Sequence, residues 1–160
     1  MKSFVEALKD NSQAALERHR AHFPSDTELS LQVLKGHLLI EELVRELVDA
    51  RLADPKALEG ESGTSFNCHQ MICLAEALTS NAKELPWTWK ATKKLNAMRN
   101  KLAHRLDYAM LQKDVDAFTT FCVKEQPDIE EDMVAVGIPQ NHLFESCIMS
   151  ISTALVAFRG

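Results

Sequence analysis

The chain has 160 residues, a length that predicts one domain able to bury a core without metals or disulfides. Its formal net charge of −5 at pH 7 argues against a general binder of duplex DNA, because such proteins present a strongly basic surface. Only 5 Gly and 5 Pro occur, and aromatic residues make up 6%, a composition that favours long helices over strands and turns.

The first residues, Met1 to Glu6, lack the apolar run of a signal peptide. No uncharged stretch approaches the length of a transmembrane helix. We therefore expect a cytoplasmic protein that does not associate with a membrane. In that compartment cysteines stay reduced, and none of the four here has CxxC spacing. We expect all of them to be unpaired: Cys68, Cys73, Cys122 and Cys147.

Two capping boxes predict where the first two helices begin. Ser3 and Glu6 are three residues apart and start a helix expected over about 3–21. Ser25 and Glu28 repeat this spacing and start a helix expected over about 26–52, which the Asp54-Pro55 pair ends. One stripe of the second helix is apolar: Leu29, Val33, Ile40, Val44, Leu47 and Val48. A second apolar strip, Leu31, Leu34 and Leu38, widens it, which is typical of the central helix of a bundle.

The rest of the chain also shows helical periodicity. Residues 54–64 contain a proline and two glycines and predict a loop. The segments that follow predict helices at about 65–80, 87–107 and 113–125, a short acidic helix at 127–137, and a last helix at 141–158 capped by Asn141. We therefore predict an all-α, up-and-down bundle of about five to six helices in a single domain, 1–160. Its core would span about 28–125, with the helices at 3–21 and 141–158 packed on it.

The helix expected at 87–107 has two chemically different faces. Its core stripe is Trp87, Ala91, Leu95, Met98, Leu102 and Leu106. Asn100 and His104 lie almost opposite this stripe, and Arg99 borders it, so a guanidinium, an amide and an imidazole share one edge. They form either a functional site or, alternatively, a surface ion pair of Arg99 and an ordinary exposed histidine.

The segment Leu95-Asn96-Ala97-Met98-Arg99-Asn100-Lys101-Leu102-Ala103-His104-Arg105-Leu106 resembles the signature of HEPN domains, an Arg and a His separated by four to six residues near the end of a long helix. In many members that are RNases a polar residue, often Asn, follows the Arg, as Asn100 does here. The resemblance covers roughly residues 28–125 and is specific only in these twelve residues.

The resemblance implies a homodimer in which both motifs meet in one cleft, and metal-independent cleavage of RNA by attack of the ribose 2′-OH, with no cofactor. His104 would transfer a proton or orient the 2′-OH, and Arg99 would stabilise the charge on the phosphorane. Asn100 would position the phosphate or His104. Basic side chains around the motif would bind RNA: Lys93, Lys101 and Arg105.

Members of this family include toxins and stress or phage-defence effectors, some paired with an antitoxin or nucleotidyltransferase. Toxins of the latter kind often carry His-x-Tyr, whereas here Arg105-Leu106 follows His104 and Tyr108 comes four residues after it. Two alternatives therefore remain beside the RNase. One is a non-catalytic HEPN-like module that binds a nucleotide, RNA or a partner protein. The other is a small helical regulatory protein whose motif is only a dimer contact.

Two further groups of residues have ordinary explanations and less ordinary ones. His37 falls on the apolar stripe of the second helix, so it is either a core histidine with a local hydrogen bond or a supporting residue beside the Arg99/His104 cleft, with Glu41 one turn on. Cys68, His69 and Cys73 match no common zinc spacing, so we expect buried thiols and no metal there.

Overall fold

A computed structural model describes residues 4–61, 65–105 and 107–160, with side chains from residue 13 onward. Over these residues the chain is all-α. Seven α-helices form: α1 (Phe4–His22), α2 (Leu29–Asp49), α3 (Cys68–Leu78), α4 (Pro86–His104), α5 (Tyr108–Glu125), α6 (Ile129–Ala135) and α7 (Leu143–Arg159). Two 3₁₀ turns, η1 (Pro55–Leu58) and η2 (Ala82–Glu84), lie in the connections. None of the described helices is long and apolar enough to cross a membrane.

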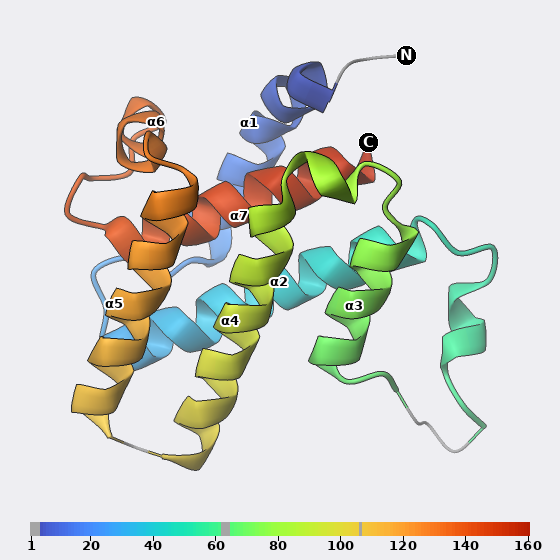
Figure 1. Ribbon diagram of the computed structural model, residues 1–160, viewed down its shortest axis with the longest axis horizontal. Helices are drawn as coiled ribbons and strands as arrows, with labels where there is room; N and C mark the ends of the chain where they lie inside the picture. The colour runs from blue at the N-terminus through green and yellow to red at the C-terminus, as the bar shows by residue number, and fades with distance from the viewer. Residues whose placement is uncertain (1–3, 62–64, 106) are drawn as a thin grey trace.

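The predicted helical bundle is confirmed, and its helices lie in two crossed sets. Figure 1 shows α3, α4 and α5 side by side, running up and down across α2 and α7 behind them. A short connection joins the lower ends of α4 and α5, while η1 stands out at the far side of α3. The seven described α-helices fall in the seven segments predicted to be helical, including the short acidic segment and both terminal segments, so the expected total of about five to six was too low.

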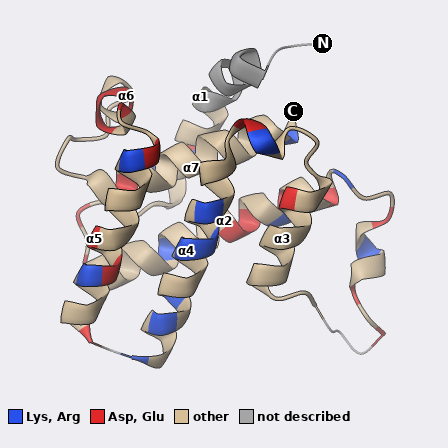
Figure 2. Ribbon diagram, in the orientation of Figure 1, with Lys and Arg blue, Asp and Glu red and all other residues tan. Residues whose placement is uncertain are grey.

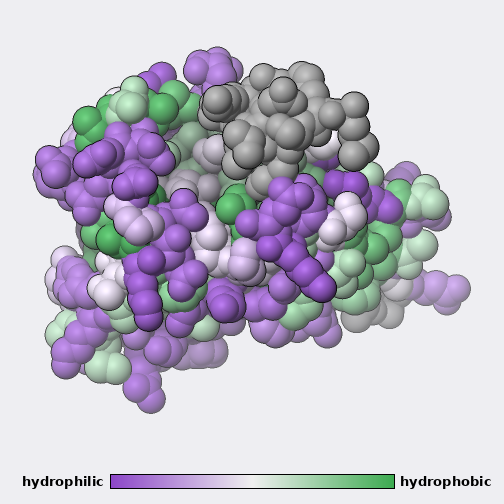
Figure 3. Space-filling view, turned by 45° about the horizontal axis from the view of Figure 1, so that its top comes forward, coloured by the Kyte–Doolittle hydropathy of each residue, from purple (hydrophilic) through white to green (hydrophobic). Residues whose placement is uncertain are grey.

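The core lies where α2 and α7 pack against α3, α4 and α5. The apolar stripe predicted for α2 is confirmed, because Val33, Ile40 and the residues that follow it in the stripe are buried. The prediction that a second apolar strip widens the buried face of α2 is wrong, since the side chains of Leu34 and Leu38 are 41% and 47% exposed. Neighbouring helices cover only one side of α2. The face drawn in Figure 3 is mostly hydrophilic, with hydrophobic side chains in separate patches.

A glycine lets α2 and α7 approach closely. A Cβ atom on Gly36 would lie 3.2 Å from Cγ1 of Ile148 on α7 and 3.4 Å from Cε2 of Phe23. Both distances are tighter than an ordinary van der Waals contact, so a side chain larger than a methyl group at this position would disturb the helix crossing. Further along α7, the ring of Phe158 stacks on Trp89 with centroids 5.2 Å apart, which fixes the start of α4 over the end of α7.

A polar network ties α1 to α7. Glu145, only 7% exposed, accepts a hydrogen bond from the Ser25 hydroxyl at 2.8 Å and lies 3.0 Å from His19 Nε2. His142 Nδ1 lies 3.0 Å from the other carboxylate oxygen of Glu145, and its Nε2 lies 3.1 Å from Asp26. Burial raises the pKa of Glu145, but the hydrogen bonds from His19, Ser25 and His142 outweigh it and hold that pKa below its usual value.

This network explains why two predicted helix caps are wrong. Ser25 bonds to Glu145 instead of to a helix amide, Asp26 has a left-handed φ of 61°, and α2 begins only at Leu29 without a side-chain cap. The cap predicted at Asn141 is also wrong, because the residue directly before α7 is His142. A capping box that we did not predict starts α3, where Asn67 and Gln70 bond reciprocally. The box expected at Ser3 lies outside the described residues.

Candidate functional site

The motif lies on the second half of α4, whose buried face holds it against the bundle. Five of the six predicted core residues, from Trp87 to Leu102, are buried, and Leu106 lies outside the described residues. The opposite face is exposed as predicted: Ala97, Asn100, Ala103 and His104. The helix itself ends at His104, three residues earlier than expected, and Arg105 adopts an extended backbone.

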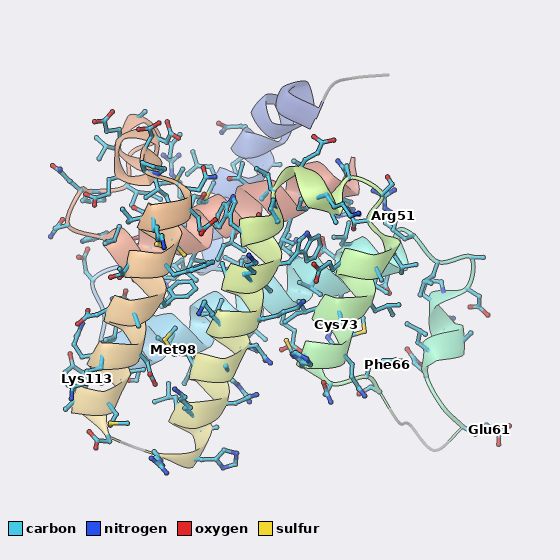
Figure 4. The ribbon with its side chains drawn as sticks, viewed as in Figure 1. Arg51, Glu61, Phe66, Cys73, Met98 and Lys113 are labelled. Carbon is cyan, nitrogen blue, oxygen red and sulfur yellow. The ribbon has the colours of Figure 1, made fainter. Side chains whose placement is uncertain are left out.

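His104 borders a pocket between the ends of α4 and α5, which we name the α4–α5 pocket. It has a volume of about 660 Å³. Its polar lining includes Asn100, Lys101, His104 and Arg105, and its apolar lining includes Met98 and Met110. Met98 lies between the two helices in Figure 4. The pocket therefore combines an imidazole, an amide, two cations and the carboxylates of Asp107 and Asp114 with apolar side chains, a mixed lining of the kind found in small-molecule sites.

Arg99 borders a different pocket, of about 470 Å³, on the α2 and α3 side of α4. We name it the α2–α3–α4 pocket. His37, Glu41, Cys68 and Asn96 line it together with Arg99. Asn100 belongs to both pockets, and its Oδ1 accepts a hydrogen bond from Arg99 Nη1 at 3.3 Å. Within one copy, then, Asn100 connects the two predicted catalytic groups, while Arg99 and His104 face different pockets.

His37 fits both interpretations offered for it. It is 5% exposed, and its Nε2 lies 3.0 Å from Oδ1 of Asn96, a buried residue that sequence reasoning did not single out. It also lines the pocket that Arg99 faces, with its Nδ1 3.8 Å from Glu41. Burial lowers the pKa of His37, against the opposing effects of the Asn96 hydrogen bond and the Glu41 charge. Protonation of the buried ring is therefore less favourable than protonation of a solvated histidine.

The basic residues around the motif do not form one patch. Figure 2 shows Lys and Arg distributed along α4. Lys93, predicted to bind RNA, pairs with Glu76 of α3 at 2.6 Å and lies outside the α4–α5 pocket. Lys101 pairs with Asp114 of α5 at 3.1 Å, at the edge of that pocket. Arg105 is exposed and also lines it. Of the three predicted RNA-binding cations, the pocket thus gathers two.

The cysteines differ in their exposure. All four are free thiols in the structure, with Cys122 and Cys147 buried in the core. The expectation of buried thiols at the start of α3 is wrong for Cys73, which is exposed (labelled in Figure 4) and lies 3.7 Å from His69 Nε2. Cys68 is half-buried, 3.5 Å from His37 Nε2, and burial together with the Glu41 charge raises its pKa to about 11.

No protein-family model, no curated protein and no solved structure matches the chain. What this chain does must therefore be argued from its own residues.

Proposed function

We propose that this chain is a metal-independent endoribonuclease of the HEPN class. The observation that carries the proposal is the exposed end of α4, where His104 and Asn100 line an open pocket with Lys101 and Arg105. These side chains supply the proton-transfer group, the positioning amide and the phosphate-binding cations that cleavage by 2′-OH attack requires. A role as a toxin or a stress or defence effector, with an antitoxin or nucleotidyltransferase partner in the cytoplasm, belongs to the same proposal.

In this mechanism His104 removes the proton of the ribose 2′-OH, or orients that hydroxyl, as its oxygen attacks the adjacent phosphorus. The bond to the 5′-oxygen of the next nucleotide breaks, and that oxygen takes a proton from water or from the protonated His104 and leaves as a 5′-hydroxyl. A 2′,3′-cyclic phosphate remains. Arg99 stabilises the extra negative charge of the phosphorane. Because Arg99 and His104 face different pockets in one copy, we infer that the active site is completed when a second copy places its own α4 against the first.

The test is incubation of the purified protein with mixed RNAs in EDTA, followed by analysis of the product ends. Cleavage should persist and leave 2′,3′-cyclic phosphates. Arg99→Ala and His104→Ala should each reduce the rate by about 10²–10⁴-fold, the usual cost of losing one proton-transfer group or charge stabiliser. Asn100→Ala should cost less. The control is His22→Ala, which removes an exposed histidine of α1 far from the motif in sequence and should leave the rate unchanged.

Abolition of cleavage by EDTA, or full activity of His104→Ala, would show that any RNase activity is of another type. The second candidate is then a non-catalytic module, and the placement of Arg99 and His104 in separate pockets is the observation that favours it. Such a module would retain labelled RNA or a nucleotide without producing fragments, and Lys101→Ala or Arg105→Ala would weaken that binding.

A further inference from the structure

Three residues with metal-binding side chains converge in the α2–α3–α4 pocket. His37 and Glu41 are one helical turn apart on α2, and Cys68 is the first residue of α3. One donor atom from each lies within 4.8 Å of the other two, and they form the one group of this kind among the residues the structure describes. The three come from positions 31 residues or fewer apart, in no spacing typical of zinc motifs, so only the fold brings them together.

The geometry matches a tetrahedral metal centre. Zinc bonds of about 2.3 Å to sulfur and about 2.0–2.1 Å to nitrogen imply a separation of about 3.5 Å between the two donors in a tetrahedral site. The observed distance from His37 Nε2 to Cys68 Sγ is 3.5 Å. Glu41 faces the other ring nitrogen, Nδ1, at 3.8 Å, so its carboxylate would have to turn toward the point between Nε2 and Cys68 Sγ when the ion binds. Its side chain is 22% exposed, which leaves room for this movement.

We propose that His37, Glu41 and Cys68 bind one Zn²⁺ ion and leave its fourth position open to the α2–α3–α4 pocket. A nitrogen, an oxygen and a sulfur donor form a set that zinc accepts and that magnesium and calcium do not. A neutral imidazole, a carboxylate and a thiolate also balance the two positive charges of the ion. The open position would hold a water molecule. Asn96 Oδ1, which now lies 3.0 Å from His37 Nε2, would have to move off that nitrogen when the ion binds, and it could then accept a hydrogen bond from the water.

Neighbouring residues already orient these side chains. Arg45 donates to Glu41 at 2.7 Å and to the backbone carbonyl of Phe66 at 3.3 Å, so it holds both the acidic ligand and the segment that leads into Cys68. Such outer contacts fix the direction of metal ligands. Zinc must displace the thiol proton of Cys68, which passes to solvent, so affinity should rise with pH.

The site shares its pocket with Arg99 and Asn100, but no metal takes part in the proposed RNA cleavage. The experiment therefore measures metal binding alone, in full-length protein freed of metal by a chelator and then titrated with Co²⁺, which replaces Zn²⁺ and is coloured. We expect one equivalent to bind, with the absorption of a tetrahedral centre and a charge-transfer band from the thiolate. Zn²⁺ should displace it and raise the melting temperature.

Cys68→Ser should abolish the charge-transfer band, and Glu41→Gln should weaken binding by about tenfold or more, since even outer-shell changes cost that much. Cys73→Ser is the matched control, because this exposed thiol also lies near a histidine but is not one of the three ligands, and it should keep the band. In the wild-type protein, Zn²⁺ should protect Cys68 from alkylation and leave Cys73 reactive, a measurement that needs no variant.

Absence of cobalt absorption at millimolar metal would overturn the proposal. So would a band that survives in Cys68→Ser or disappears in Cys73→Ser. Neither result depends on whether the protein cleaves RNA, so a failure of this proposal and a failure of the RNase proposal are distinguishable.

Discussion

His37 contacts polar groups through both ring nitrogens although it is almost completely buried. Its Nε2 faces Asn96 and Cys68, and its Nδ1 faces Glu41. Every one of these neighbours comes from a different turn or helix, so this single imidazole connects α2, α3 and α4 at the pocket that Arg99 lines. A side chain in this position affects both the stability of the fold and the chemistry of the pocket.

We predict that His37 makes the metal-free protein less stable in mild acid. Burial holds its pKa in the folded protein below the value of 6.5 expected when the chain is unfolded. The unfolded chain therefore binds the proton more readily, and the free energy of unfolding falls as the pH drops below 6.5. Urea unfolding in EDTA from about pH 7.5 to about pH 5, above the range in which Glu145 titrates, measures this loss.

The comparison for this experiment is His37→Gln, which keeps a polar side chain but does not titrate. It should be less stable than the wild type at neutral pH and should lose less stability on acidification. An equal pH dependence in the two proteins would show that other groups cause the effect.

At the scale of helices, the crossing of α2 and α7 depends on a small residue at position 36. We predict that Gly36→Leu destabilises the protein by about 1–3 kcal/mol, the usual cost of forcing extra methylenes into a packed core. Ile148 and Phe23 would both have to move, because a Cβ alone would lie 3.2 Å and 3.4 Å from their side chains. Urea unfolding monitored by circular dichroism measures the change.

Gly36→Ala provides the graded control. Alanine gains about 1 kcal/mol of helix propensity over glycine, and the nearest atoms are the ends of the flexible Ile148 side chain, 3.2 Å and 3.3 Å away. The two effects oppose each other, so the alanine variant should unfold near the wild-type urea concentration. If the leucine variant also unfolds near the wild-type urea concentration, the helices pack less tightly at this crossing than the structure shows.

The helices could be predicted from sequence, but their ends and their convergence could not. Periodicity of apolar residues located α2 and α4 and the buried stripe of each, because a helix must bury one face. Ser25 looked like a helix cap, but its hydroxyl bonds to Glu145, a residue 120 positions away. Helical periodicity also predicted which motif residues share one face of α4. The approach of Cys68 and Asn96 to His37 could not be predicted, because it depends on how three helices pack.

At the scale of the whole molecule, the exposed face of α4 is the surface on which we expect a second copy to pack. Its side chains are small or polar at Ala97, Asn100 and Ala103, and large apolar side chains lie exposed next to it on α5, where Tyr108 is 64% and Met110 is 43% exposed. Small residues allow two helices to approach closely, and exposed apolar residues gain from being covered.

We therefore predict a homodimer that Ala103→Trp weakens without loss of helix content, because the indole would hold the two α4 helices apart. Sedimentation at micromolar concentration measures the association, and circular dichroism checks the fold. Ala57→Trp is the control, since Ala57 is exposed in η1, at the far side of α3 from this face (Figure 1), and should leave the dimer intact. A wild-type protein that sediments as a monomer would contradict the prediction.

The packing of α1 against α7 has a consequence for folding during translation. The buried residues Ala15 and Leu16 of α1 cluster with Ile138 and with Met149 of α7, and His19 meets Glu145 across 126 positions. During translation α1 leaves the ribosome long before its partner exists, with this side uncovered. Contacts over such a distance also form slowly. For the nascent chain, the interval between the synthesis of α1 and that of α7 is thus a period of exposure to chaperones, proteases and aggregation.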